Sequence, residues 1–271
     1  MTSAILKVEN VAKRFVTATG TVEALAETSI EVREGEFVAV IGPSGCGKST
    51  LFNIIGGLES ADGGRVLVGG TPIDGSHRDI GMVFQEESTF PWRTVVENVA
   101  FPLEVAGMAR RAREEKAMRF VQLVGLDGFE RRYPAELSGG MRQRTALART
   151  LCAEPRILLM DEPFAALDEQ TRMLLGEKLI EICTALNQTT LLITHNLSEA
   201  VQLSDRVLVM SFRPGRIKRT VAIDLPRPRT TDVIASERFA SYLGTIWEDL
   251  KAEAAKGLQA METARRAAPA A

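Results

Sequence analysis

The chain has 271 residues, which is enough for one large domain or for a domain with a subdomain. Apolar residues make up 45% of it, so a proper core can be buried. The 33 basic residues nearly balance the 35 acidic ones, and the net charge of −2 excludes a general electrostatic attraction to DNA or RNA.

Short β-rich runs and helix-like stretches alternate along most of the chain, which implies a mostly parallel sheet with helices on both faces. In chain order the predicted elements are strands Ile5–Val11, Ala24–Val32 and Phe37–Ile41, helix Lys48–Ile55, strands Arg65–Val68 and Ile80–Phe84, helices Val95–Val105 and Arg111–Val124, strand Ile157–Met160, helix Glu169–Leu186, strand Thr190–Thr194, helix Leu197–Leu203, strand Arg206–Met210 and helix Ser236–Leu258.

Three regions depart from this alternation. Residues 87–137, approximately, are predicted to form a helical insertion, with its first helix bent or broken by Pro102. Residues 211–235 are rich in Arg and Pro and are predicted to be irregular or edge-like. We therefore expect one large domain over residues 1–235, followed over 236–271 by an amphipathic helix and a frayed tail.

The chain carries no apolar run near the ~18–20 residues that span a bilayer. Its start, Met1–Lys7, lacks the layout of a signal peptide, so we expect a cytosolic protein, in which any membrane role would come through a partner. Cys46, Cys152 and Cys183 are scattered and show no metal-binding spacing, which predicts reduced thiols rather than disulfides or zinc ligands.

The strongest motif fits GxxxxGK[ST] and reads Gly42-Pro43-Ser44-Gly45-Cys46-Gly47-Lys48-Ser49-Thr50. It follows an apolar strand and opens a helix, where free N–H groups and the helix dipole favour a phosphate. Glycines allow the backbone close to phosphate oxygens. We predict that Lys48 reaches the β- and γ-phosphates of a nucleotide and that the Ser49 hydroxyl binds Mg²⁺.

A second acidic motif ends the predicted strand Ile157–Met160, which is followed by Asp161 and Glu162. A strand buried on both faces should not end in adjacent carboxylates without a reason. We predict that Asp161 holds Mg²⁺, through water, and that Glu162 polarises the water that attacks the γ-phosphate. The alternative is that one acid merely caps the next turn.

A third motif decides the class and reads Leu137-Ser138-Gly139-Gly140-Met141-Arg142-Gln143-Arg144. It closely resembles the LSGGQ signature of ABC ATPases, with Met141 where Gln is commonest. Ser138, Gly139 and Gly140 open a predicted helix, which is a second anion-binding N-terminus in one chain. The resemblance implies an α/β P-loop ATPase core with a small antiparallel β-subdomain and a helical insertion. It also implies that two copies associate head to tail, with ATP between the phosphate loop of one and the signature of the other.

Further motifs of this family follow in the expected order. Gln85 matches the Q-loop and is predicted to touch Mg²⁺ and the attacking water. Asp168, in the run Ala166-Leu167-Asp168, matches the D-loop, and His195 matches the switch histidine that contacts the γ-phosphate. Phe15 lies where the family stacks an aromatic ring on adenine, although it could instead belong to the core. By contrast, His77 lacks such a context and is predicted to be a surface residue.

Two stretches resemble the nitrate, sulfonate and taurine branch of bacterial importers. They are Gln85–Val95, which includes Pro91-Trp92, and Arg213-Pro214-Gly215-Arg216-Ile217 followed by Leu225–Arg229. This resemblance implies two transmembrane permease subunits, an extracytoplasmic substrate-binding protein reached indirectly, and a place on the cytoplasmic face of the membrane. The alternative is that the first stretch is a packed loop and the second a solvated one. No residue here should touch the cargo, so the solute stays open.

The segment Ser88–Val95 follows Gln85 and enters the helical insertion, so we predict that it couples the ATPase to a permease. Trp92 would be the anchor and Arg93 a flanking donor, unless Trp92 packs inside its own subunit. Two other ABC-type classes are alternatives. A DNA-repair or chromosome-maintenance ATPase would carry a long coiled-coil insertion, and a translation-associated protein would usually carry two cassettes.

Overall fold

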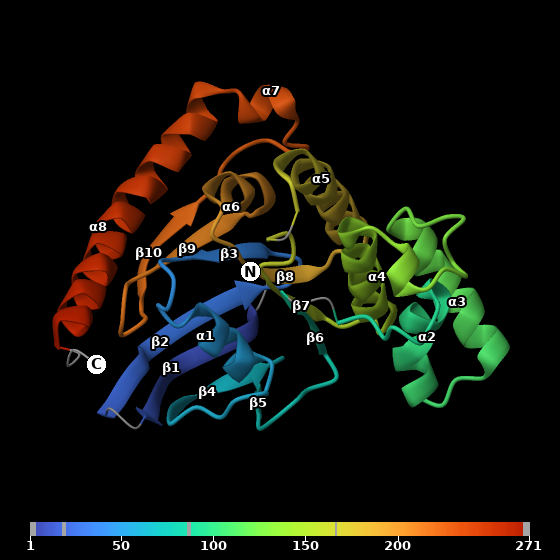
Figure 1. Ribbon diagram of the computed structural model, residues 1–271, viewed down its shortest axis with the longest axis horizontal. Helices are drawn as coiled ribbons and strands as arrows, with labels where there is room; N and C mark the ends of the chain where they lie inside the picture. Colours follow the sequence, from blue (N-terminus) through green and yellow to red (C-terminus); the bar gives the residue numbers. More distant parts are fainter. Residues whose placement is uncertain (1–3, 18–19, 86–87, 166, 268–271) are drawn as a thin grey trace. The chain divides into compact units, whose positions relative to one another are not determined.

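The computed structural model describes residues 4–17, 20–85, 88–165 and 167–267, and only the backbone of residues 231, 258 and 260–267. The chain divides into two compact units, which are described separately. Figure 1 labels the helices and strands. Unit 1 comprises Met1–Ser76 and Leu192–Ala271, and unit 2 comprises His77–Leu191. Among the motif residues, Glu86, Glu87 and Ala166 lie outside the described residues, as does most of the predicted tail (268–271).

The first sheet of unit 1 is antiparallel and has the strand order β2-β1-β4-β5. Its strands are β1 (Ala4–Thr17), β2 (Gly20–Arg33), β4 (Gly63–Val68) and β5 (Thr71–Ile73). Strands β1 and β2 run further than predicted, because their pairing continues through Phe15 with Val22 to Thr17 with Gly20. The predicted strands Ile5–Val11 and Ala24–Val32 were therefore too short on the sides that face each other along the chain, since cross-strand pairing extends into polar residues whose local pattern is weak. The short strand β5 was not predicted.

The second group of strands in unit 1 surrounds β3 (Phe37–Ile41), all five residues of which are buried. Strand β9 (Arg206–Met210) runs parallel to β3, and β10 (Ile217–Ala222) lies antiparallel to β9. A strand without exposed positions is what a sheet covered on both faces requires. The predicted edge character of 211–235 is confirmed, because β10 is an edge strand; α7 (Thr231–Ile234) follows it.

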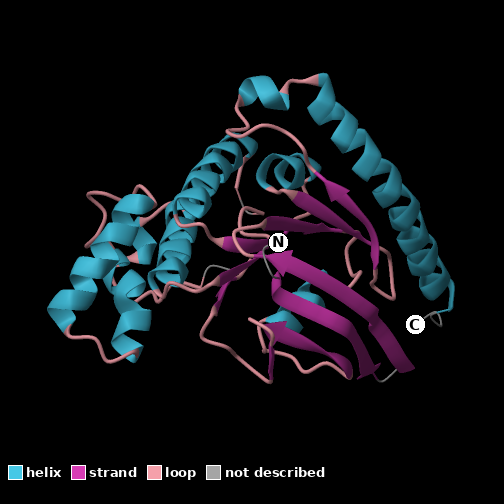
Figure 2. Cartoon of the chain, turned by 180° about the vertical axis from the view of Figure 1, so that it is seen from behind, coloured by secondary structure: helices cyan, strands magenta, loops and turns pink. Residues whose placement is uncertain are grey.

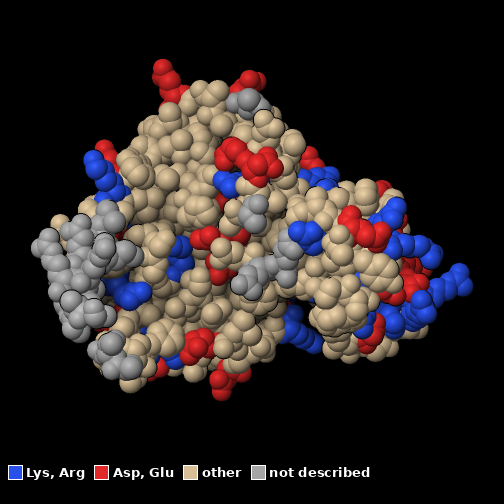
Figure 3. Space-filling view, viewed as in Figure 1, with Lys and Arg blue, Asp and Glu red and all other residues tan. Residues whose placement is uncertain are grey.

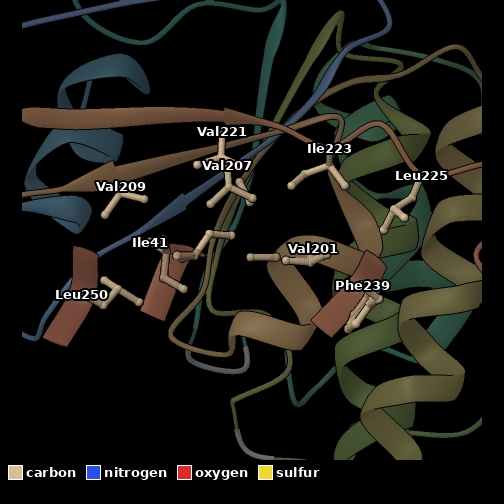
Figure 4. Close-up of a cluster of buried hydrophobic side chains, with 12 residues drawn as sticks. Ile41, Val201, Val207, Val209, Val221, Ile223, Leu225, Phe239 and Leu250 are labelled. Carbon is tan, nitrogen blue, oxygen red and sulfur yellow. The ribbon is translucent and has the colours of Figure 1, made fainter. Parts of the chain in front are cut away.

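Helices α1 (Lys48–Ile55), α6 (Leu197–Leu203) and α8 (Glu237–Ala267) complete unit 1. Figure 4 shows a buried cluster in which side chains of β3, β9 and β10 meet α6 and α8. Phe239 of α8 lies in this cluster and is fully buried, so its truncation to Ala should cost about 3–5 kcal/mol of stability. Helix α8 runs beyond the predicted end, because residues 259–267 are mostly Ala, Met, Glu and Arg, which favour helix.

Unit 2 contains the parallel strands β6 (Ile80–Val83) and β7 (Ile157–Asp161), and its helices are among those drawn in cyan in Figure 2. The helices are α2 (Val95–Val105), α3 (Arg110–Leu123), the single turn η1 (Pro134–Glu136), α4 (Gly139–Cys152) and α5 (Glu169–Ala185). Strand β8 (Thr189–Ile193) contains the boundary between the units. Helix α2 starts with a capping box between Thr94 and Glu97, and it continues past Pro102, which does not break it.

Charges of both signs mix on the surface, as the near balance of the composition predicts. On the face shown in Figure 3, Lys and Arg lie among Asp and Glu. Helix α3, for example, pairs Arg110 with Glu114 at 2.7 Å. Over the described stretches of the chain, no helix is both long enough and apolar enough to cross a membrane.

Candidate nucleotide-binding site

The phosphate loop connects β3 to α1 in unit 1. Gly45 and Gly47 have positive φ angles, of 74° and 100°, in a region that favours glycine. A Cβ on Gly47 would also lie 2.7 Å from the Ala24 carbonyl oxygen of β2. Glycine at 47 is therefore required both by the turn of the loop and by its packing on the antiparallel sheet. Ser44 and Ser49 are exposed in this loop, as ligand-binding hydroxyls must be.

The Lys48 side chain lies across the phosphate loop and is only 8% exposed. Its Nζ donates to the carbonyl oxygens of Gly42 at 2.8 Å and Pro43 at 3.2 Å. The Cys46 thiol lies 3.9 Å from the same nitrogen, and burial raises the pKa of that thiol. The ammonium is thus tethered to the loop that would surround a phosphate, which is the place the motif predicts. Pro43 and Thr50 are half-buried at the two ends of the motif.

His195 follows β8 in unit 1 and is exposed. The residue before it, Thr194, donates its N–H to the Val40 carbonyl of β3 at 3.3 Å. Since β3 leads into the phosphate loop, this bond holds the backbone next to His195 against the strand that carries the loop. The Thr194 hydroxyl contacts the Glu199 carboxylate, and Asn196 caps α6 by accepting from the Glu199 N–H at 3.0 Å. This cap fixes where the chain turns directly after His195.

Phe15 belongs to the β1–β2 hairpin and is 37% exposed, so it is not part of the core. The Lys13 ammonium lies 5.3 Å from the centre of its ring. Of the two alternatives for Phe15, the buried one is excluded. The ring is accessible, and whether it stacks on adenine stays a prediction.

In unit 2, the parallel pairing of β6 and β7 places Val83 opposite Met160. Parallel strands end on the same side of a sheet, so Gln85, two residues after the end of β6, comes to the side where Asp161 ends β7 and Glu162 follows it. Gln85 is exposed, and both acids are half-buried. Glu162 has a φ angle of 46°, which is rare for a residue other than glycine. Such strain is concentrated at functional sites, which favours a role for Glu162 beyond capping a turn.

The signature serine is the N-cap of α4. The Ser138 hydroxyl is exposed and accepts from the Met141 N–H at 3.4 Å, a long bond that an anion could replace. Gly139 is half-buried and Gly140 buried. A Cβ on Gly140 would make ordinary contacts with Thr171 of its own chain. Packing within the subunit therefore does not require glycine there.

Asp168 is exposed and is the N-cap of α5. Its carboxylate accepts from the Thr171 N–H at 2.9 Å and from the Thr171 hydroxyl at 2.7 Å, and these bonds lower its pKa. His77 is half-buried, contrary to the expectation of a surface residue, because its Nδ1 accepts from the Asp79 N–H at 3.2 Å and holds the turn before β6.

The sequence reasoning missed two contacts of the phosphate loop. The Arg213 side chain donates to the Gly45 carbonyl at 3.0 Å, and Gly215 lies against the Cys46 carbonyl. Both belong to the Arg-Pro-Gly-Arg stretch, which had been noted only as a feature of one family branch. The three cysteines, predicted to be reduced thiols, are buried and are not joined in disulfides.

Comparison with known proteins decides the class. The ABC transporter family matches residues 25–165. An uncharacterised ABC transporter ATP-binding protein of Methanocaldococcus jannaschii is 50% identical over 254 residues, covering 94% of each chain. This chain belongs to the ABC transporter family. It is an ATP-binding subunit of a transporter, and it is an ABC ATPase.

Two relatives of this ABC ATPase are named as import proteins. The nitrate import ATP-binding protein NrtD of Synechocystis is 45% identical, over 83% of this chain and 85% of its own. The aliphatic sulfonates import ATP-binding protein SsuB of Bacillus cereus is 43% identical, over 83% and 88%. These names are no support for the DNA-repair or chromosome-maintenance alternative.

Solved structures agree with the fold. A dimeric ATP-binding cassette in a post-hydrolysis state, bound to ADP and phosphate, has a TM-score of 0.72 and is 32% identical, over 80% of this chain and 98% of that one. A Clostridium perfringens CbiO protein, described as part of an ABC transporter complex, has a TM-score of 0.74 and is 27% identical, over 90% and 95%. The predicted fold class, a P-loop ABC ATPase with an antiparallel β-subdomain and a helical insertion, is confirmed.

Proposed function

We propose that this ABC ATPase energises the import of a small solute of the nitrate, sulfonate and taurine type. The observation that carries this proposal is its similarity to NrtD and SsuB over 83% of the chain. ATP binding closes a dimer, hydrolysis reopens it, and the cycle moves two permease subunits between inward- and outward-facing states. The subunit would lie on the cytoplasmic face of the membrane, and a substrate-binding protein on the other side would deliver the solute.

We assign the chemical roles as the motifs suggest. Residues 42–50 bind the phosphates, with Lys48 neutralising the charge that develops on the β- and γ-oxygens. Glu162 orients and polarises the attacking water, and His195 and Gln85 contact the γ-phosphate and that water.

Mg²⁺ suits the oxygen donors of the site. The Ser49 hydroxyl, the Gln85 amide and the Asp161 carboxylate are the hard ligands that Mg²⁺ prefers, and Mg²⁺ usually completes its shell with water and substrate phosphates. When bound, the ion would neutralise phosphate charge. These three residues of the chain would hold and orient it.

Two copies would share each nucleotide. The exposed hydroxyl of Ser138 and the accessible N-terminus of α4 favour an anion that the chain's own packing does not supply. We therefore infer that they contact ATP bound to the phosphate loop of a second copy, with Asp168 near the same interface. A dimeric relative bound to ADP and phosphate supports this arrangement.

A mixed dimer tests the shared site. A Lys48→Ala chain paired with a Ser138→Arg chain has both defects in one composite site and an intact second site. We expect such mixtures to hydrolyse ATP faster than either variant alone. If mixed dimers form and activity does not recover, the site is not shared in trans.

The permease contact is assigned to the Ser88–Val95 segment of unit 2. Trp92 is 71% exposed, so it does not pack inside its own subunit, and its ring lies 5.6 Å from Phe90. Arg93 is held by two hydrogen bonds to Glu104, at 2.9 and 3.2 Å. A large, exposed and rigidly flanked aromatic ring suits an anchor for a short helix of a permease.

Buried side chains fix the backbone of this segment. Asn98 is fully buried; its Oδ1 accepts from the Phe90 N–H, and its amide nitrogen donates to the carbonyls of Phe90, Arg93 and Thr94 at 2.9–3.1 Å. Arg149 of α4 donates to the Ser88 carbonyl at 2.7 Å and to its hydroxyl at 2.6 Å. Preorganisation of this kind lowers the entropic cost of docking.

Transport in vesicles tests the proposal directly. The chain would be assembled with its permease and binding protein, and uptake of labelled nitrate, taurine and an alkanesulfonate would be measured. We expect ATP-dependent uptake of one of them by the wild-type complex and none by Glu162→Gln. An assembled complex that hydrolyses ATP yet takes up none of these solutes would contradict the import class.

A further inference from the structure

The loop between β9 and β10, Ser211–Arg216, lies against the outside of the phosphate loop within unit 1. The Arg213 Nε donates to the Gly45 carbonyl at 3.0 Å. That carbonyl and the N–H of Cys46 belong to one planar peptide and point in opposite directions. A hydrogen bond that fixes this carbonyl therefore fixes the direction of the Cys46 N–H, which donates to the Pro43 carbonyl within the loop at 3.3 Å, and it polarises that N–H as a donor.

Close packing reinforces this contact. A Cβ on Gly215 would lie 2.1 Å from the Cys46 carbonyl oxygen, so only glycine brings the two backbones this near. The Gly215 N–H donates to Ala24 of β2 at 2.9 Å, and its carbonyl accepts from the Ala26 N–H at 3.1 Å. The Ser211–Arg216 loop is thus tied to the antiparallel sheet and has little freedom to move away from the phosphate loop.

Helix α8 holds the same loop from the other side. The Glu253 carboxylate, 3% exposed, accepts from the Phe212 N–H at 2.9 Å. It also pairs with Lys256 at 2.8 Å and with Lys218 at 3.3 Å. On the next turn of α8, a Cβ on Gly257 would lie 3.1 Å from the Phe212 ring, so the absence of a side chain there leaves room for that ring.

The charge of Glu253 is compensated where it lies. Burial raises the pKa of this carboxyl, but hydrogen bonds from Lys256, the Phe212 N–H and Lys218 lower it by more, so the net pKa is below the ordinary value. The group is therefore ionised at neutral pH. An ionised carboxylate accepts a stronger hydrogen bond from a backbone N–H than a neutral group does.

We propose that Arg213 is a positioning residue of the phosphate loop, and that Glu253 of α8 acts on nucleotide affinity by holding Phe212, the neighbour of Arg213. The chain of contacts runs from Glu253 through the Phe212 N–H and the Arg213 guanidinium to the Gly45–Cys46 peptide. Helix α8 thereby reaches the nucleotide site without touching the nucleotide. Any partner that pulled on α8 would change ATP binding.

The first test compares two arginines of the same loop in the full chain. Arg216 is exposed, and its side chain forms no hydrogen bond or ion pair within the described part of the chain, so Arg216→Ala is the matched control for Arg213→Ala. We expect Arg213→Ala to weaken ATP binding about fivefold, as measured by isothermal titration calorimetry. The KM for ATP should rise similarly, the kcat should change little, and the Tm without nucleotide should stay near the wild-type value. Wild-type affinity in a folded Arg213→Ala protein would overturn the proposal.

The second test compares two carboxylates of α8. Asp249 also pairs with Lys218, at 3.3 Å, but among the described residues it forms no bond to the Ser211–Arg216 loop. We expect Glu253→Ala to weaken ATP binding severalfold and Asp249→Ala to leave it unchanged. The double variant Arg213→Ala/Glu253→Ala should bind ATP as weakly as Arg213→Ala alone, because both act through one path. Equal effects of the two carboxylates, or additive effects in the double variant, would refute the path.

Glu253→Gln separates positioning from mere stability. Its amide oxygen still accepts from the Phe212 N–H, while the pairing with Lys218 and Lys256 loses its charge. We expect a lower Tm with near wild-type ATP affinity. If the Gln variant loses affinity in step with its Tm, Glu253 acts only through stability. This comparison and the two arginine variants decide the question even if Glu253→Ala does not fold.

Discussion

Replacing Asn98 by Ala removes the side chain that holds the Ser88–Val95 segment in place. The amide makes four hydrogen bonds to the backbone of this segment and is fully buried. The amide nitrogen has only two hydrogens, so its three contacts count as two full bonds. With the bond to Oδ1 and a net value of about 1 kcal/mol for each, the upper figure is near 3 kcal/mol, and water reaching the loosened backbone should reduce the loss to about 2 kcal/mol. The loss of stability should affect unit 2 and leave the phosphate loop of unit 1 unchanged.

Two measurements check this prediction. Urea denaturation of the isolated subunit should show the loss of stability, and a pull-down with the permease should show weaker assembly, because Trp92 is no longer presented by a fixed backbone. ATP affinity should match wild type. Gln122→Ala, which removes an exposed amide of the same unit, is the control and should change neither quantity. A loss of stability below about 0.5 kcal/mol, or normal assembly in a clearly destabilised Asn98→Ala protein, would refute the reasoning.

Three further outcomes are expected. Lys48→Ala should lower the ATPase rate at least ~100-fold, because it removes the cation tethered inside the phosphate loop; steady-state phosphate release measures this. Glu162→Gln should lower the rate by a similar or larger factor of ~10²–10⁴ while ATP still binds, so that size-exclusion chromatography shows a nucleotide-dependent dimer. Burial raises the pKa of Cys152 to about 11 and also raises that of Cys46, so little thiolate exists at pH 7.5. Iodoacetamide should therefore leave the native protein unmodified and alkylate three thiols in urea, as mass spectrometry would show.

Much of the fold could be predicted where the sequence marks the ends of elements. The predicted bounds of β3, α1, α2, α6 and β9 match the structure. Strand β3 is a short apolar run between Gly35 and the phosphate loop, and α2 begins at a Thr94–Glu97 capping box. In both cases the signal lies within a few residues. The β1–β2 hairpin and β5 could not be bounded in this way, because the pairing of distant strands determines where they end.

The same distinction between local patterns and distant contacts applies to the candidate site. Short motifs located Lys48, Ser138, Asp161 and Glu162, since each motif concentrates its chemistry in adjacent residues. The contacts that set their geometry are distant in sequence. Arg213 and the Gly45 carbonyl, for example, are 168 residues apart. A single sequence offers no local pattern for such a pair.

This division has a physical reason that bears on function. A phosphate loop must present several N–H groups in one direction, and its glycines, which permit that conformation, also permit others. The glycines of the loop therefore need neighbouring groups that exclude the other backbone conformations. Gly47 is confined by the Ala24 carbonyl of β2, and Gly45 by the guanidinium of Arg213. Since Arg213 adjoins Phe212, whose N–H bonds to Glu253, one of these restraints depends on a helix near the end of the chain. The nucleotide affinity of this ATPase should thus be set by α8 as well as by the motif that binds the phosphates.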